Sequence, residues 1–516
     1  MDSKADEIIK RRSKLSPAKQ AILEKRLQGK HKPDTQQIKR VSRDLELPLS
    51  FAQQRLWFLH QLQPNSYTYN DHGAILLQGS LNIKALKQSI NEIVRRHEIW
   101  RTSFQIVNGQ SVQIIAPALE IPLPIIDLQD LPNTKHEAEI QRLRLENYQQ
   151  PFDLAQTPLL RLTLLQLKTR EYVLLLTIHH IIVDGWSQGV FLRELSVLYE
   201  AFSRGKPSPL TEINIQYADF ASWQQNWLQG EVLDTLLTYW KKQLGDNLPV
   251  LKLPTRRQSK SQTSQEERET LMISKILSQE IKNLGDSLGT TLFMTLLGAF
   301  KVLLYCYTGE KDIVIGTDIA NRNLIEIENL IGFFVNQLVL RSSLFENQTF
   351  NDFLQQVRKV CLESYAHQDL PFEKLVSALN PKRGLNQTPI FQVKFILPST
   401  PTNTLEISDL TFTRLDLLEN TVARFDLLLE ITETELGIVG LFKYNKDLFD
   451  SISISRLVKN FEIILSQVVI DPNIQLNHLK EILINLDKEY QLSEERKRKE
   501  EYKQKLSRVK RKIIEL

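Results

Sequence analysis

The most informative hydrophobic pattern in the chain is a short apolar run that ends in a polar turn. Residues 172–178 read Tyr-Val-Leu-Leu-Leu-Thr-Ile, which is apolar on both faces and rich in branched side chains. This composition predicts a buried strand. Residues 186–202 instead have helical spacing, with Phe191, Leu195 and Leu198 on one side, and predict a helix. The polar residues between the two segments should therefore lie on a strand-to-helix connection.

This connection carries two adjacent histidines, His179 and His180, followed by Asp184 and Gly185. Neighbouring residues of a strand face opposite sides, so one histidine is expected to face a pocket while the other braces the loop. An imidazole, with an unperturbed pKa of about 6.5, suits proton transfer at neutral pH. From the residues alone, catalysis, a metal site and a structural role stay open, although no His/Cys cluster accompanies the pair to complete a metal site.

Asp184 could orient a histidine, pair with an arginine behind the loop, or share a metal. Our first hypothesis for an arginine partner is Arg101, which follows a predicted helix over residues 81–97, and the second is Arg55. Such a pair would hold the loop by a bidentate contact. Loss of one partner would leave a buried charge, which costs about 3–5 kcal/mol.

Changes in composition divide the chain into two folded lobes and three polar segments. The predicted segments are a helical leader (1–45), an N-terminal lobe (46–252), an inter-lobe loop (253–268), a C-terminal lobe (269–486) and a charged tail (487–516). The leader is either a solvated helix or a docking segment for another protein. The tail is either a solvated segment or a basic arm that docks an acidic partner protein.

The overall composition is that of a globular protein: 516 residues, of which 42% are hydrophobic and 24% are charged, predict two or three lobes. The net charge of +4 is small and gives no indication of nucleic-acid binding. Two cysteines, Cys306 and Cys361, are too few for a disulfide framework and fit a reducing cytosol. No apolar run approaches the roughly 20 residues of a membrane span. We therefore expect a cytoplasmic protein without nucleic-acid or membrane partners.

The motif His179-His180-x-x-x-Asp184-Gly185 resembles the active-site motif of the condensation domains of nonribosomal peptide synthetases. These domains belong to the chloramphenicol-acetyltransferase-like acyltransferases. Six signatures of the family occur in order, and the resemblance covers about residues 46–485. Besides the histidine motif, they lie at residues 50–57 (Ser-Phe-Ala-Gln-Gln-Arg-Leu-Trp), 96–104, 217–223, 331–337 and 367–376.

The chain departs from the family pattern at a few positions. Trp100 stands where leucine is usual, and Gln337 stands where threonine is usual. In a further, poorly matching signature, Gly384, Asn386 and Gln387 replace Asp, Ser and Arg. Any role that those charges have in the family is therefore not carried over to this chain.

The resemblance implies an α/β fold of two chloramphenicol-acetyltransferase-like lobes, arranged as a V-shaped pseudodimer with a central tunnel. It also implies transfer of an acyl or aminoacyl group from the phosphopantetheine thioester of a carrier protein to an amine, which forms an amide. No cofactor or metal would be bound by the chain itself, because the substrates arrive on the phosphopantetheine of donor and acceptor carrier proteins.

The resemblance assigns roles to the motif residues. His180 would lie near the attacking amine, as a general base or as an orienting group. The Gly185 backbone N–H could meet the oxyanion, Asp184 would be structural, and His179 would support the loop. Three further residues are assigned to the substrate tunnel, namely Trp186, Ser187 and Asn336.

Because no adenylation or carrier segment accompanies these signatures, we expect a monomeric, stand-alone condensation enzyme that works in trans in peptide or hybrid peptide-polyketide biosynthesis. The motif looks most like that of domains joining an L-configured donor to an L-configured acceptor. Two alternatives remain. One is a carrier-dependent acyltransferase that uses a free amine or alcohol, and the other is a catalytically silent recruiting domain.

Overall fold

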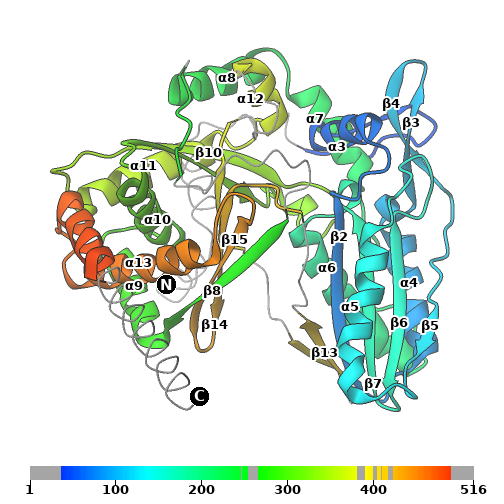
Figure 1. The fold of residues 1–516 in the computed structure, drawn as a ribbon. Helices are drawn as coiled ribbons and strands as arrows, with labels where there is room; N and C mark the ends of the chain where they lie inside the picture. Colours follow the sequence, from blue (N-terminus) through cyan, green and yellow to red (C-terminus); the bar gives the residue numbers. More distant parts are fainter. Residues whose placement is uncertain are drawn as a thin grey trace, which may run out of the picture.

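The computed structural model describes residues 37–245, 247–253, 265–380, 390–398, 404–407, 410–415 and 422–489. Much of the predicted leader, loop and tail lies outside the described residues, as do Gly384, Asn386 and Gln387. The described residues form two halves, each built on a six-stranded sheet. The halves meet near α3 (Phe51–Leu62) and α12 (Phe372–Leu379) and diverge at the opposite end (Figure 1). The two-lobed α/β fold expected from the sequence is confirmed.

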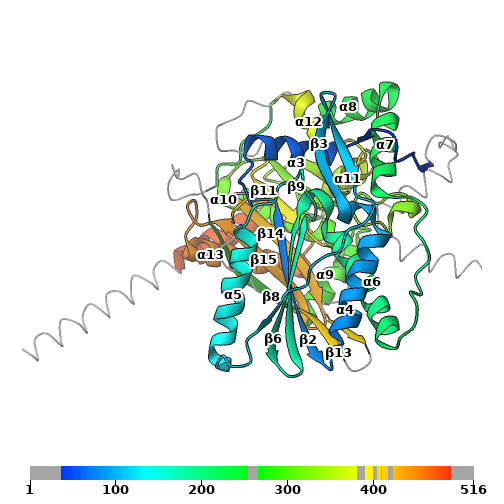
Figure 2. The ribbon, with the colours of Figure 1, turned by 90° about the vertical axis from the view of Figure 1, so that its right-hand side faces the viewer.

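The first half is a sheet in the order β12-β13-β2-β7-β6-β5 with helices on both faces. Helices α4 and α6 cover one face and α5 covers the other (Figure 2). Along β7, Leu174 and Leu176 are buried under α4 and α6, whereas Val173 and Leu175 are buried on the α5 side. The run is therefore apolar at successive positions from Val173 to Leu176 because both faces are covered. The bounds are β2 Asn70–Gly79, β5 Ile125–Asp127, β6 Leu160–Lys168, β7 Glu171–His179, β12 Thr404–Ile407, β13 Leu410–Leu415, α4 Ile83–Arg96, α5 Asn133–Gln149 and α6 Gly185–Ser203.

A smaller sheet, in the order β1-β4-β3, lies beside α3 and α7 near the junction of the two halves (Figure 1). Ser50 starts α3 with a capping box, in which its side chain accepts the Gln53 N–H and the Gln53 side chain accepts the Ser50 N–H. Helix α8 packs into the core of the second half through Trp240 and Leu244. The bounds are β1 Leu47–Pro48, η1 Glu98–Arg101, β3 Thr102–Val107, β4 Gln110–Ile115, α7 Tyr217–Trp227 and α8 Gly230–Leu244.

The second half is a sheet in the order β10-β9-β11-β14-β15-β8. Strand β11 is parallel to both neighbours, and the other pairs are antiparallel. Helices α9, α10, α11 and α13 pack against this sheet (Figure 1). The bounds are β8 Glu266–Ser274, α9 Lys275–Ser287, α10 Leu292–Thr308, β9 Asp312–Ile319, η3 Ile325–Ile327, β10 Asn336–Ser343, α11 Phe350–Ala366, β11 Val393–Ile396, β14 Leu427–Thr434, β15 Gly437–Asn445 and α13 Ser451–Ile470.

The hairpin β12–β13 crosses from the second half of the chain into the sheet of the first. β13 pairs antiparallel with β2, from Leu410 opposite Gly79 to Leu415 opposite Ala74. This corrects the prediction that all of residues 269–486 form the C-terminal lobe. The physical reason is that the edge of β2 that faces away from β7 would otherwise have unpaired backbone groups. Pairing with β13 satisfies these groups.

Two predicted boundaries also shift. The inter-lobe loop was expected to reach residue 268, but β8 begins at Glu266, because Glu266–Arg268 pair with residues 443–445 of β15. The tail was expected from residue 487, which lies within a helical stretch over 476–489. Among the described helices, no single one has the length and apolar composition of a membrane span, although the bent pair α9 and α10 meets those criteria jointly.

Candidate active site

The histidine motif lies on the connection between β7 and α6, as the hydrophobic pattern predicts. β7 ends at His179, residues His180–Ile182 form a short 3-10 turn (η2), and α6 begins at Gly185. Asp184 caps α6, because its carboxylate accepts the Ser187 N–H at 2.8 Å. The cap determines where the helix begins and therefore where the motif residues lie.

The His180 side chain is half-buried and borders a chamber of about 340 Å³ between the two halves. Its Nδ1 lies 2.7 Å from the carbonyl oxygen of Val183. Because a carbonyl oxygen can only accept, Nδ1 carries the proton, and in the neutral ring Nε2 keeps its lone pair. Nε2 can therefore accept a proton from a group bound in the chamber.

Both halves of the chain form the walls of this chamber. Arg55 of α3 pairs with Glu373 of α12 at 3.3 Å, and Lys394 of β11 pairs with Asp318 of β9 at 2.7 Å. Burial lowers the pKa of Lys394, and the neighbouring Asp318 opposes that effect. Much of the charge on the wall is thus neutralised within the protein. The remaining lining residues are Leu56, Thr68, Tyr69, Phe333, Val335, Asn336, Gln337, Phe372, Ile390, Phe391, Arg424 and Phe425.

The other histidine, His179, is buried away from the chamber, with 4% of its surface exposed. Its Nδ1 accepts the N–H of Ile181 at 3.2 Å, which caps the 3-10 turn. Burial lowers the pKa of His179 to about 3, with smaller contributions from neighbouring His180, His60 and Arg424. At neutral pH this ring is therefore uncharged and holds the backbone of the loop.

Asp184 pairs with Arg322, an arginine of the second half of the chain that the sequence pattern did not indicate. Arg322 Nη2 lies 3.2 Å from the Asp184 carboxylate, and both side chains are almost fully buried. Its Nη1 donates to the carbonyls of Ile327 and Leu330 at 2.6 and 2.7 Å. Burial lowers the pKa of Arg322, and Asp184 opposes that effect. This buried pair ties the motif to the second half.

A model of the condensation domain family matches residues 44–492. The chain belongs to the condensation domain family. Condensation domains of nonribosomal peptide synthesis work with carrier-bound substrates.

Similar proteins support this assignment. This condensation domain is 44% identical over 448 residues to one of the linear gramicidin synthase proteins of Brevibacillus parabrevis, a match covering 86% of this chain and 6% of that protein. Among solved structures, the X-domain from teicoplanin biosynthesis in complex with OxyB is 26% identical, with a TM-score of 0.75, over 87% of this chain and 98% of that one. The first condensation domain of the calcium-dependent antibiotic synthetase has a TM-score of 0.72 at 18% identity, over 84% of this chain and 99% of that one, which shows the same fold.

Neither arginine expected beside Asp184 is its partner. Arg101, the last residue of the 3-10 turn η1, donates to the carbonyl of Ala116, and Arg55 pairs with Glu373 at the chamber wall. The physical reason is that the Asp184 site is closed by the loop after β9. The sequence does not indicate that this loop folds onto α6. Arg322 could therefore not be recognised from the sequence as the partner of Asp184.

Two of the three residues expected in the tunnel do not border the chamber. Ser187 is fully buried, and its hydroxyl accepts from Arg322 at 2.8 Å and from the Gly332 N–H at 3.0 Å. Trp186 is half-buried, and its indole N–H donates to the carbonyl of Glu328 at 2.9 Å. Both side chains therefore join α6 to the loop of the second half.

Asn336 does border the chamber, but its amide is occupied by backbone groups. Its Nδ2 donates to the carbonyls of Gln368 and Leu370, each at 2.8 Å. Its Oδ1 accepts the N–H groups of Phe372 and Gln337 at 3.0 and 2.9 Å. A side-chain amide has two donors and two acceptor lone pairs. The Asn336 amide therefore has no donor or acceptor left for a substrate.

Gly185 is the first residue of α6 and is exposed. The first N–H groups of an α-helix have no partner within the helix, and that end carries a partial positive charge. A Cβ added at Gly185 would meet no atom within 4 Å. The protein itself therefore leaves space beside this N–H, and packing does not require glycine here.

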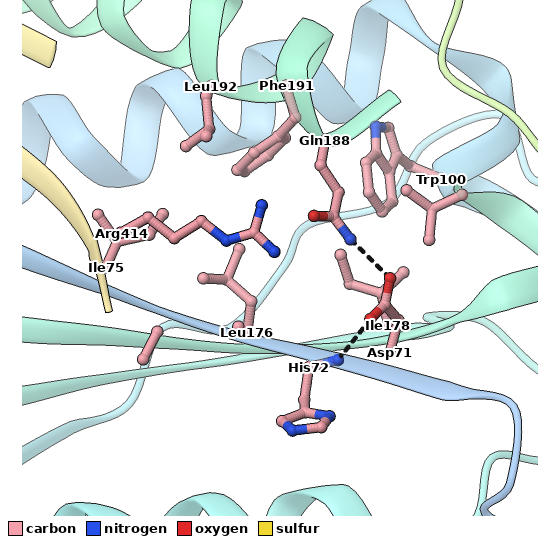
Figure 3. Close-up of a pocket in the computed structure, with 13 residues that line it drawn as sticks. Asp71, His72, Ile75, Trp100, Leu176, Ile178, Gln188, Phe191, Leu192 and Arg414 are labelled. Atoms are coloured by element: carbon pink, nitrogen blue, oxygen red, sulfur yellow. Dashed lines mark hydrogen bonds between the residues drawn. The ribbon is translucent and has the colours of Figure 1, made fainter. Parts of the chain in front are cut away.

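A second, smaller pocket of about 50 Å³ lies between β2, β7 and α6 (Figure 3). Val183 lines it, so it adjoins the motif, but it shares no lining residue with the chamber. Figure 3 shows apolar side chains around it, with Gln188 donating to Asp71 at 2.6 Å and Arg414 reaching in from β13. Within the described ranges, no group of three or more His, Cys, Asp or Glu residues is placed to hold a metal.

Proposed function

We propose that this condensation domain transfers an aminoacyl or peptidyl group from the phosphopantetheine thioester of a donor carrier protein to the amine of a carrier-bound acceptor, forming an amide. The observation that supports this proposal is the His180 ring, which borders a chamber lined by both halves and keeps its lone pair on Nε2 because Nδ1 is bonded to a carbonyl. The chain spans only 6% of the gramicidin synthase relative described above, so its activity, substrates and partners are proposals of our own.

The position of His180 at the chamber supports the following steps. The amine nitrogen attacks the thioester carbonyl, so that a C–N bond forms, the C–S bond breaks and the pantetheine thiol leaves. His180 Nε2 holds or accepts the proton that the amine loses, and the thiolate is protonated in turn. A thioester is reactive enough that positioning and oxyanion stabilisation can supply the remaining acceleration.

The oxyanion of the tetrahedral intermediate would lie at the N-terminus of α6. Gly185 supplies a free backbone N–H there, and the helix adds its positive end. The apolar pocket beside Val183 is suited to a small apolar part of the donor acyl group. No bound cofactor is needed, because phosphopantetheine arrives with the substrates.

Intact-protein mass spectrometry of carrier proteins tests the proposal. A donor carrier loaded with an aminoacyl group is mixed with a loaded acceptor carrier and either wild type or His180→Ala. With wild type we expect the acyl group to appear on the acceptor carrier. With His180→Ala we expect no transfer to the acceptor. Equal transfer by both would remove His180 from the reaction.

The same assay separates the alternatives. Transfer to a free amine or alcohol, but not to a loaded acceptor carrier, would favour the acyltransferase alternative. Carrier binding without transfer across several donors would favour a recruiting domain. Transfer with carriers supplied as separate proteins would support the in-trans, stand-alone arrangement, which stays a prediction. The cytoplasmic location and monomeric state are also predictions, to be checked by cell fractionation and light scattering.

A further inference from the structure

The segment from Ile331 to Phe334, which belongs to the second half of the chain, is bonded to the motif of the first half. The Gly332 N–H donates to Ser187 Oγ at 3.0 Å, and the Phe334 N–H donates to the Asp184 carboxylate at 2.9 Å. The Ile331 N–H donates to a ring nitrogen of a buried histidine at 3.3 Å. The backbone of this segment is therefore fixed relative to the cap of α6.

Tyr217 of α7 fixes the same segment from the other side. Its hydroxyl donates to the carbonyl of Phe333 at 2.6 Å and lies 2.8 Å from Ser50 Oγ. A Cβ added at Gly332 would lie 2.0 Å from the Tyr217 ring, so no side chain fits at that position. The segment is thus held between α7 and the motif, and only its backbone can approach so closely.

This arrangement leaves one side chain of the segment in the chamber. Ile331 and Phe334 are buried in the core of the first half, with 1% and 2% of their surfaces exposed. Phe333 is half-buried, borders the chamber and packs against the His180 ring, with ring centroids 5.1 Å apart and planes inclined by 51°. The contact partner of the proposed base therefore comes from the second half of the chain.

We propose that Phe333 is a positioning residue for His180. The inference rests on the proposed function, because it concerns the residue assigned there as base or orienting group. The terminal torsion of a histidine is broad, and the Nδ1–H···O=C bond to Val183 fixes only one edge of the ring. The Phe333 ring, held by its bonded backbone, restricts the rotation that would exchange Nδ1 and Nε2.

The first test needs no substrate. Proteins labelled with ¹⁵N-histidine are examined by NMR, and the His180 signals are assigned by their absence from His180→Ala. In wild type we expect one neutral tautomer, with the proton on Nδ1. In Phe333→Leu we expect a mixture of tautomers, and in Phe333→Tyr we expect the wild-type spectrum. Phe425→Leu is the matched control, because Phe425 borders the same chamber and stacks on Phe391 instead.

The second test measures transfer with the carrier pair that wild type uses. Phe333→Leu should lower kcat by about tenfold to a hundredfold, because misplacement of a catalytic group by about 1 Å can cost about a hundredfold. KM should stay within about threefold, because ground-state binding is not removed. Phe333→Tyr should restore kcat.

Two outcomes would overturn the proposal: a single Nδ1-protonated tautomer in Phe333→Leu, or an unchanged kcat in that variant. Failure of the proposed function has a different result, which is equal acyl transfer by wild type and His180→Ala in the carrier assay. In that case the NMR test would still decide whether Phe333 orients the His180 ring.

Discussion

Replacing Arg322 by methionine should destabilise the protein far more than removing Arg55. Methionine keeps the apolar volume of the side chain, so the change removes mainly the charge and its hydrogen bonds. Arg322 is 4% exposed and donates to Asp184, to Ser187 and to two carbonyls. The variant therefore leaves the Asp184 carboxylate buried without a cation.

The expected magnitude follows from the remaining contacts of Asp184. Removing one partner of a buried ion pair costs about 3–5 kcal/mol. Asp184 still accepts the Ser187 and Phe334 N–H groups, which places the expected loss near the lower end, at about 3 kcal/mol. The Arg55–Glu373 pair has side-chain exposures of 37% and 23%, and a pair of that kind contributes about 0–1 kcal/mol.

The measurement is urea unfolding at constant temperature, followed by tryptophan fluorescence, with Arg55→Ala as the matched control. A double variant, Arg322→Met with Asp184→Asn, should lose less than the sum of the single changes, because the unpaired charge is gone. A loss below about 1 kcal/mol for Arg322→Met, or strict additivity in the double variant, would refute the reasoning.

Three further predictions concern single residues. Gly185→Ala should leave the free energy of unfolding within about 0.5 kcal/mol of wild type, because the added Cβ meets no atom. The variant should nevertheless slow acyl transfer if the oxyanion lies beside the Gly185 N–H. Unchanged transfer would place the oxyanion elsewhere. Asn336→Ala should cost about 1–3 kcal/mol for the backbone groups it leaves unpaired, measured by thermal unfolding, and wild-type stability would contradict the bonding described. Burial lowers the pKa of His179 to about 3 in the folded protein, whereas a histidine in the unfolded chain has a pKa of about 6.5. As the pH falls, His179 is therefore protonated in the unfolded chain before it is protonated in the folded protein. Stability should therefore decrease from pH 6.5 towards pH 3 by up to about 1.4 kcal/mol per pH unit for this group, and His179→Gln should flatten that slope in urea unfolding; equal slopes would show that His179 already charges in the fold.

Local features of the site could be predicted from the sequence. The apolar run of β7 and the helical spacing of α6 place His180 and Asp184 on one connection, because both patterns arise from residues close together in the chain. The different surroundings of the two histidines were also expected, although they arise because β7 ends at His179 and His180 begins the 3-10 turn η2.

The long-range features could not be predicted. Arg322 lies 138 residues from Asp184, and nothing in its sequence context shows which loop it will close. Asn336 is the first residue of β10, and only the fold reveals that four backbone groups already occupy its amide. The hairpin β12–β13 was not predicted from the sequence, and the strand β2 with which β13 pairs is separated from it by most of the chain.

The crossing hairpin determines how this domain can be recombined. A chimera joined within residues 253–268 would separate β2 from the strand that covers its edge and would leave Asp184 with the Arg322 and Phe333 of a different parent. Exchange of the first half should therefore carry residues 322–334 and 404–415 with it. In this respect the structural unit of the candidate site is discontinuous in the sequence.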